Sequence, residues 1–374
     1  MCINYVTLLH FCRSLHRKAL MKILFIIPYP PGKAPSQRFR FEQYFPLLES
    51  GNISFTVKPF LSEEVWNILY LPGRFSRKAC AIIGGLFRRF FLLFSLKQYD
   101  YIFIHREATP VGPAFFEFIA ARILKKKIIY DFDDAIWIPN FSEANSFFSF
   151  LKGYSNVKHI CRWAYKISCG NEFLCNYALQ YNKNVSYNPT TIDTENYHNI
   201  VKDQKAGNFV IGWTGSHSTI RYINEVLPVI KELENKFEFK FMVISDLKPE
   251  FELKSLVYHK WKKDSEISDL LNFNVGIMPL KDDRWAKGKC GFKALQYMAL
   301  GIPAIVSPVG VNTRIVNNGI NGFICETPEE WKTALTSVLN DRNELIRLGE
   351  NTRTKIESEY SVHSNAANFI NLFS

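Results

Sequence analysis

The sequence predicts an α/β protein with two doubly wound, Rossmann-like domains that face each other across a cleft. Its 374 residues are long for one domain and suit two. In both halves, short apolar runs alternate with helical stretches, which is the pattern of parallel sheets covered by helices. Residues 188–207 have turn formers and charges without periodicity, as a linker does.

The predicted domain limits follow from these patterns. We interpret residues 1–20 as a non-native extension, because Met21 begins a complete strand with a methionine of its own. A signal peptide is the alternative for that segment. The first domain is predicted over 21–187, the linker over 188–207, and the second domain over 208–357. A final helix over 358–374 is expected to return to the first domain.

The strands are predicted from apolar runs of four to eight residues. In the first domain they lie at 22–27, 53–60, 100–104, 127–130, 166–169 and 184–187. In the second domain they lie at 209–213, 239–245, 256–260, 274–279 and 303–307.

Helices are predicted where apolar residues recur at three and four positions. In the first half they cover 37–48, 75–99, 109–124 and 171–181. In the second half they cover 218–233, 265–271, 292–300, 328–339, 342–357 and 362–372.

Composition limits the classes of partner. Hydrophobic residues make up 47% of the chain, as in a packed globular protein, and the formal net charge is +11. A basic surface attracts nucleic acid, anionic lipid or anionic small ligands. No nucleic-acid-binding motif is present, so nucleotide-linked substrates or a membrane surface fit better. The eight scattered cysteines indicate reduced thiols in a cytoplasmic protein, without a disulfide framework or a zinc site.

The most informative stretch is 287–310, KGKCGFKALQYMALGIPAIVSPVG. It starts with a basic loop containing Gly288 and Gly291, and a helix follows. A glycine loop lets the backbone approach a ligand, and the N–H groups at a helix N-terminus favour a phosphate. Lys289 and Lys293 add full charges beside that terminus. A diphosphate suits this arrangement, although an ordinary loop with solvated lysines is the alternative.

These residues resemble the donor-binding segment of GT-B glycosyltransferases of family 4, or group 1. That family usually has E-x-F-G-(x)3-L-E-A-M-A-x-G-x-P, with two glutamates eight positions apart. Gly291 stands at the inner glycine, and Gln296 stands at the second glutamate, which contacts the ribose in the family. Gly288 replaces the first glutamate, which contacts the donor sugar. The resemblance covers Met21 to the end of the chain, with the most specific part at 289–326.

The resemblance implies a nucleotide-diphosphate sugar as donor. In the family, the loop after the first strand of the second domain has an Arg and a Lys that bind the diphosphate, and this chain lacks both. We expect Lys289 and Lys293, with hydroxyls from the 214–218 loop, to replace them. The expected donor-binding residues are Thr214, Ser216, Lys289, Gly291, Phe292, Lys293 and Gln296.

Candidate residues of the first domain follow predicted strands. The family often places a histidine near the transferred sugar, and His105 could occupy that position; it is assigned a catalytic role together with Lys293. Arg38 is expected to face an anionic acceptor. Asp131, Asp133 and Asp134 are assigned to the cleft, where they would bind Arg or acceptor hydroxyls. A rival hypothesis is a metal site at Asp131 and Asp133, as in the Asp-x-Asp signature of GT-A glycosyltransferases.

The predicted helix at 75–99 is apolar but has Arg88 and Arg89 at its middle. Central charges cost about 2.5–3.5 kcal/mol each in a transmembrane helix. We therefore interpret it as an amphipathic helix that can lie on anionic lipid through residues 74–97. A buried helix with basic edges is the alternative.

The sequence thus predicts a cytoplasmic glycosyltransferase, with a peripheral position on the inner face of the cell membrane as an option. The expected reaction moves a sugar from a nucleotide-diphosphate sugar to a hydroxyl of a glycan or lipid-linked acceptor in surface polysaccharide synthesis. The family suggests retention of anomeric configuration, and no metal or other cofactor is expected. The alternatives are a nucleotide-sugar epimerase of GT-B architecture and a non-catalytic membrane scaffold.

Overall fold

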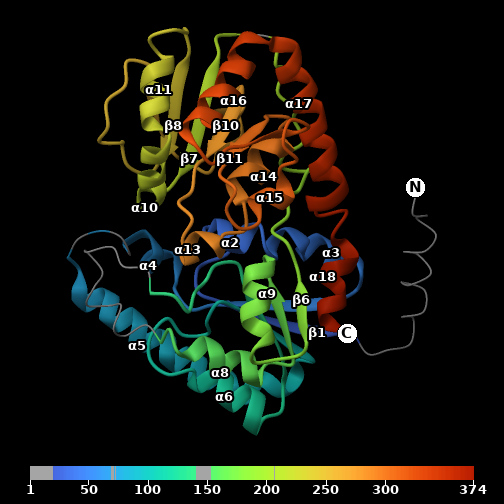
Figure 1. Ribbon diagram of the computed structural model, residues 1–374. Coiled ribbons are helices and arrows are strands. Elements are labelled where there is room, and N and C mark those ends of the chain that lie inside the picture. Colours follow the sequence, from blue (N-terminus) through green and yellow to red (C-terminus); the bar gives the residue numbers. More distant parts are fainter. Residues whose placement is uncertain (1–19, 69–70, 72, 140–152, 206) are drawn as a thin grey trace.

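The computed structural model describes residues 20–68, 71, 73–139, 153–205 and 207–374. The predicted extension at 1–20 lies outside the described residues except for Leu20. Most of the segment between Trp137 and Asn156 also lies outside them. Within the described residues, the chain forms two α/β domains stacked end to end (Figure 1). The predicted fold class is confirmed.

The N-terminal domain contains a parallel sheet with the order β2-β1-β3-β4-β5-β6 among the described residues. Its central strands are buried along their length because helices cover both faces. The strands are β1 (Lys22–Ile27), β2 (Ser54–Pro59), β3 (Tyr101–His105), β4 (Lys127–Phe132), β5 (Lys166–Cys169) and β6 (Val185–Tyr187).

The helical segments of this domain connect successive strands. They are α2 (Pro35–Arg38), η1 (Glu42–Tyr44), α3 (Phe45–Ser50), α4 (Glu63–Ile68), α5 (Phe75–Leu92), η2 (Leu93–Gln98), α6 (Phe115–Phe118), η3 (Ile119–Ile123), α8 (Asn156–Trp163) and α9 (Glu172–Leu179).

The C-terminal domain repeats the plan with the order β12-β11-β10-β7-β8-β9, again all parallel. Its strands are β7 (Val210–Gly215), β8 (Lys240–Ser245), β9 (Leu256–Lys260), β10 (Val275–Met278), β11 (Ala304–Val306) and β12 (Gly322–Ile324). The order reverses at β7 and β10, so ligands are expected beyond the carboxyl ends of these two strands.

The helical segments of the C-terminal domain flank this sheet, and α10 and α13 lie at its lower edge, facing the N-terminal domain (Figure 1). They are α10 (His217–Ile220), η5 (Arg221–Glu225), α11 (Leu227–Leu233), α12 (Glu266–Leu270), α13 (Arg284–Lys287), α14 (Phe292–Ala299), α15 (Asn312–Ile315), α16 (Pro328–Asn340), α17 (Arg342–Lys355), η6 (Ile356–Tyr360), α18 (Ala366–Ile370) and η7 (Asn371–Phe373).

Close packing fixes α14 on its sheet. Tyr297 lies against Gly276 of β10, where a Cβ would meet the ring at 2.1 Å. Its hydroxyl accepts a hydrogen bond of 2.9 Å from the Thr214 amide of β7. This contact sets the distance between the start of α14 and the end of β7, which are the two sides of the switch point.

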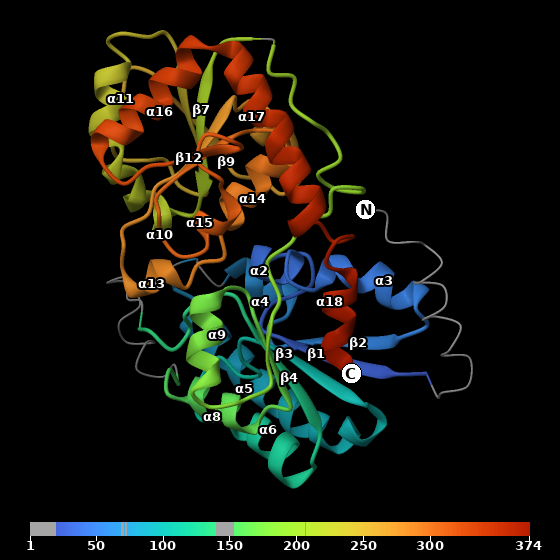
Figure 2. The same cartoon turned by 45° about the vertical axis from the view of Figure 1, so that its right-hand side comes forward.

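The end of the chain crosses back to the N-terminal domain. Long helix α17 lies on the C-terminal domain, and α18 continues beside β1 and β2 of the other (Figure 2). Phe369 stacks on Tyr44 with ring centroids 4.2 Å apart. Leu372 and Phe373 complete the same buried cluster.

The sequence overestimates the length of several helices. The predicted helix at 109–124 begins only at Phe115, because Pro110, Gly112 and Pro113 hold the preceding residues in turns. The predicted helix at 37–48 divides into α2, η1 and α3. Strand β12 is missed, because only three residues separate a double turn from the next loop.

Because Phe369 is fully buried, replacing it with Ala should lower the free energy of unfolding by about 3–5 kcal/mol. Phe115→Ala is the matched control, since that ring is 66% exposed, and it should change stability by about 0.5 kcal/mol or less. Urea titrations followed by circular dichroism measure both. Equal stability of the two variants would show that α18 does not stabilise the N-terminal domain.

Candidate functional site

The N-terminus of α14 has the geometry of an anion site. Gly291 precedes the helix with a φ of 68°, and a Cβ there would lie 2.2 Å from Ile315 Cδ1. The left-handed backbone and the lack of space together require glycine. The first N–H groups of the helix have no intrahelical acceptor, so they are available to a ligand.

Lys293, in the first turn of α14, extends toward the end of β7. Its Nζ lies 5.6 Å from the ring centroid of Trp213, and its Cε would lie 2.7 Å from a Cβ on Gly215. Burial lowers the pKa of Lys293 to about 7; the charge of Lys289 adds to this effect and that of Asp134 opposes it. An anion bound at this site would therefore raise the pKa of Lys293 and favour its protonated form.

A pocket of about 230 Å³ lies between the domains at the switch point of the second sheet. Asp134 comes from the N-terminal domain, and the remaining lining residues follow β7 or β10. They are Ser216, Ser218, Thr219, Arg221, Tyr222, Trp285 and Lys289. The structure thus brings Lys289, Ser216 and Asp134 together across the cleft.

The other expected donor-binding residues are more enclosed. The Thr214 hydroxyl donates to the Ile244 carbonyl at 3.2 Å, which fixes it inside the domain. Phe292 packs on Phe39 of the N-terminal domain, with centroids 4.5 Å apart. Gln296 is 2% exposed, and its amide nitrogen has no partner among the described residues.

Beneath the cleft, Asp131 joins a buried network in the N-terminal domain. Its carboxylate accepts hydrogen bonds from Arg40, from Ser168 at 2.6 Å and from His105 Nδ1 at 2.8 Å. Burial alone would raise the pKa of Asp131, but the charge of Arg40 and the bonds from His105 and Arg40 hold it below its usual range. Asp131 and His105 are fully buried, so they underlie the cleft wall.

The two remaining carboxylates bind one arginine that the sequence analysis did not select. Arg106 donates to Asp133 at 2.7 and 2.9 Å and to Asp134 at 2.7 Å. Its backbone has a φ of 62°, which is unusual for a residue with a side chain. No sequence signal indicated Arg106, because the residues after these two strands become neighbours only through the pairing of His105 with Asp131 in the folded sheet.

Arg38 connects the domains. Its guanidinium donates to Glu266 of α12 at 2.5 Å and to the Tyr197 hydroxyl at 3.0 Å. Because Arg38 is only 10% exposed, this ion pair is largely shielded from water. In this arrangement Arg38 binds an acidic side chain of the other domain at the position where an acceptor was expected.

The basic loop before α14 is fixed by the N-terminal domain. Asn171 Nδ2 donates to the carbonyls of Lys287 at 3.1 Å and Lys289 at 2.9 Å. A Cβ on Gly288 would lie 2.6 Å from Ala135 Cβ and 2.8 Å from its amide nitrogen. A glutamate side chain therefore does not fit at Gly288 in this arrangement, which gives the departure from the family pattern a physical reason.

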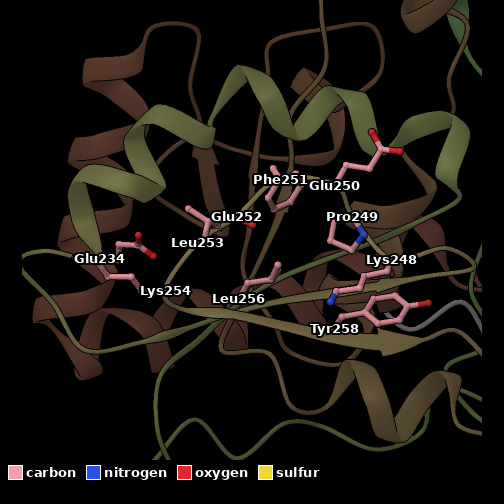
Figure 3. A pocket seen from close by; sticks show the side chains of 10 residues that line it. All are labelled: Glu234, Lys248, Pro249, Glu250, Phe251, Glu252, Leu253, Lys254, Leu256 and Tyr258. Carbon is pink, nitrogen blue, oxygen red and sulfur yellow. The ribbon is translucent and has the colours of Figure 1, made fainter.

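A larger hollow of about 920 Å³ lies along the β8–β9 side of the C-terminal domain (Figure 3). It is lined by Glu234, Tyr258 and residues between them. Among the residues that the structure describes, none of the N-terminal domain and none of the expected site residues line it. Its charged side chains are of both signs, with more acidic than basic ones, so it offers no concentrated positive charge for a diphosphate.

Removing the charge of Asp131 tests the buried network. Asp131→Asn should lower the free energy of unfolding by about 3–5 kcal/mol, because it leaves Arg40 buried without its counter-charge. Exposed Glu64→Gln is the matched control and should change stability by about 0.5 kcal/mol or less. A loss below 1 kcal/mol for Asp131→Asn would contradict the assigned ion pair.

Comparisons with known proteins relate part of the C-terminal domain to a known family. Residues 246–355 match the family model for glycosyl transferases group 1, a range that includes Lys289, Gly291, Lys293 and Gln296. No curated protein sequence matches the chain.

Solved structures share the fold over nearly the whole chain. A sucrose-phosphate synthase from Thermosynechococcus elongatus has a TM-score of 0.68 at 12% identity, over 95% of this chain and 98% of its own. A glycosyltransferase from Rickettsia africae gives 0.65 at 11% identity, over 95% and 98%. Anabaena HepE in complex with UDP gives 0.56 at 14% identity, over 94% and 99%.

These findings do not favour the epimerase or the scaffold. The chain shares the GT-B fold of solved glycosyltransferases, and its residues 246–355 are similar to glycosyl transferases group 1.

Proposed function

We propose that this enzyme transfers a sugar from a nucleotide-diphosphate sugar to a hydroxyl of a glycan or lipid-linked acceptor. The single observation that carries the proposal is Lys293, desolvated at the N-terminus of α14 beside the pocket between the domains. Structures of Anabaena HepE with UDP and with UDP-glucose support a uridine nucleotide as the first donor to test.

The chemistry follows from the charges on the two sides of the pocket. When the bond between the anomeric carbon and the diphosphate oxygen breaks, negative charge develops on the leaving oxygen. We propose that the first N–H groups of α14, Lys293 and Lys289 stabilise that charge, with the hydroxyl of Ser216, which lines the pocket together with Lys289. This grouping requires no metal ion, so we propose a metal-independent reaction.

His105 is proposed to contact the transferred sugar. Asp131 accepts from its Nδ1, so Nε2 is the acceptor nitrogen in the neutral ring. Nε2 is buried and has no partner among the described residues. We further propose retention of configuration, as the family suggests, and synthesis of a surface polysaccharide in the cytoplasm.

The carboxylates do not favour the metal-dependent alternative, because Asp131 and Asp133 are already paired with Arg40 and Arg106. Activity that persists in excess EDTA agrees with the proposal. Loss of activity in EDTA, restored by a divalent ion, would instead favour a metal site.

The function is tested on the nucleotide sugar that binds most tightly in a thermal-shift panel. Lys293→Ala should weaken its binding by about tenfold to a hundredfold, since a charge-assisted hydrogen bond contributes about 1.5–3 kcal/mol. Lys293→Arg should retain part of the affinity. Lys254→Ala is the control, because that lysine bonds Asn235 on the outer side of the same domain.

Calorimetry measures affinity, and release of nucleoside diphosphate measures turnover with a panel of acceptors. Unchanged affinity in Lys293→Ala would remove the proposed donor site. Acceptor-independent release of nucleoside diphosphate with conversion of the sugar would favour the epimerase.

A further inference from the structure

One side of α5 and η2 presents a row of large apolar side chains to solvent. Ile83, Phe87, Phe90, Phe91 and Phe94 are 53%, 60%, 53%, 64% and 72% exposed. They recur at spacings of three and four, so they form one continuous stripe on the helix. We call these five residues the phenylalanine face. Exposed apolar patches of this kind mark interaction surfaces.

The opposite side of α5 attaches the helix to the N-terminal domain. Gly85 lies against Phe60, where a Cβ would meet the ring at 2.5 Å. Arg89 is 3% exposed. Its guanidinium donates to the carbonyls of Ala108, Ile27 and Lys58 at 2.8, 3.1 and 3.0 Å.

This attachment decides between two membrane arrangements. Phe75–Gln98 is long and apolar enough to cross a bilayer, and only 17% of its most apolar window is buried. The alternative of a buried helix with basic edges therefore does not fit this exposure. Crossing a bilayer would pull Arg89 away from three carbonyls and place its charge in hydrocarbon. A helix that lies flat on a membrane keeps these bonds and covers the phenylalanine face.

The charged residues in the sequence of this helix are all positive. Residues 65–99 contain six Lys or Arg and no Asp or Glu. Arg74, Arg77, Arg88 and Lys97 are exposed, and none forms an ion pair within the described part of the chain. Like charges would repel a second copy that docked through the same face, whereas anionic lipid headgroups would attract it.

We propose that the phenylalanine face inserts into the boundary between headgroups and acyl chains of an anionic membrane, with the exposed arginines and Lys97 on the headgroups. This docking surface involves no donor-site residue and stands apart from the transferase chemistry.

The docked position has a consequence for the acceptor, which rests on the proposed function. Arg89 bonds carbonyls at the carboxyl ends of β1 and β2, and Arg88 donates to the Phe60 carbonyl just beyond β2 at 2.7 Å. The middle of α5 thus lies at the edge of the sheet that faces the cleft. A membrane on the phenylalanine face would adjoin the cleft, where a lipid-linked acceptor could reach the donor.

Vesicle flotation of the full chain tests the proposal. Vesicles of phosphatidylcholine alone are compared with vesicles that also contain phosphatidylglycerol. The wild type should float with the anionic vesicles, bind neutral ones at least about tenfold less, and dissociate as salt rises. Phe87→Ser/Phe91→Ser should lose at least about tenfold in binding. Leu179→Ser/Ile320→Ser removes two exposed apolar residues elsewhere and should bind as the wild type does.

Each outcome decides the proposal. No flotation of the wild type, or equal flotation of both double variants, overturns it. A wild-type dimer that Phe87→Ser/Phe91→Ser dissociates in sedimentation also overturns it, in favour of a second copy on the face. Nucleotide-sugar binding should be unchanged in Phe87→Ser/Phe91→Ser. Flotation without any nucleotide-sugar binding would reject the proposed function and leave the docking surface intact.

Discussion

A desolvated ammonium group at a helix N-terminus is the constraint on which the rest of the structure depends. Lys293 is half-buried against Trp213 and Gly215, and burial lowers its pKa to about 7. Loss of hydration makes the protonated form of Lys293 unfavourable when the site is empty, and a bound anion makes that form favourable again. The contact between Tyr297 and the Thr214 amide holds α14 and β7 at the distance that this enclosure requires. The second sheet is therefore organised to present one anion site to the cleft.

The N-terminal domain completes this site by fixing the loop that precedes it. Asn171 binds two carbonyls of the loop, and Ala135 fills the space beside Gly288. Asp134 then faces Lys289 across the pocket, while Arg106 holds Asp133 and Asp134 in place. Gly288, which stands in place of the family's first glutamate, thus permits the close contact between the loop and Ala135 of the N-terminal domain.

The sequence predicted the two-domain fold because strand and helix periodicities are local properties. It also singled out Gly291 and Lys293, since a glycine followed by a basic first turn has a local meaning, and their role in donor binding stays a prediction. It did not predict that Arg38 pairs with Glu266, a residue 228 positions away. The same holds for Arg106 and for the burial of Asp131 and His105. Those features depend on which strand ends become neighbours and how the domains pack, which composition and spacing do not encode.

Counting protons taken up on donor binding tests the central claim most directly. Below pH 7, Lys293 is already protonated in the free enzyme. Between pH 7 and the ordinary pKa of lysine, Lys293 is neutral in the free enzyme and takes up a proton when the diphosphate binds. The measurement is calorimetry of the tightest-binding nucleotide sugar at pH 8.0, about one unit above 7, in buffers of different ionisation enthalpy. The wild type should take up nearly one proton when the donor binds, and Lys293→Ala should take up none. Equal uptake in both proteins, or none in the wild type, would contradict the account.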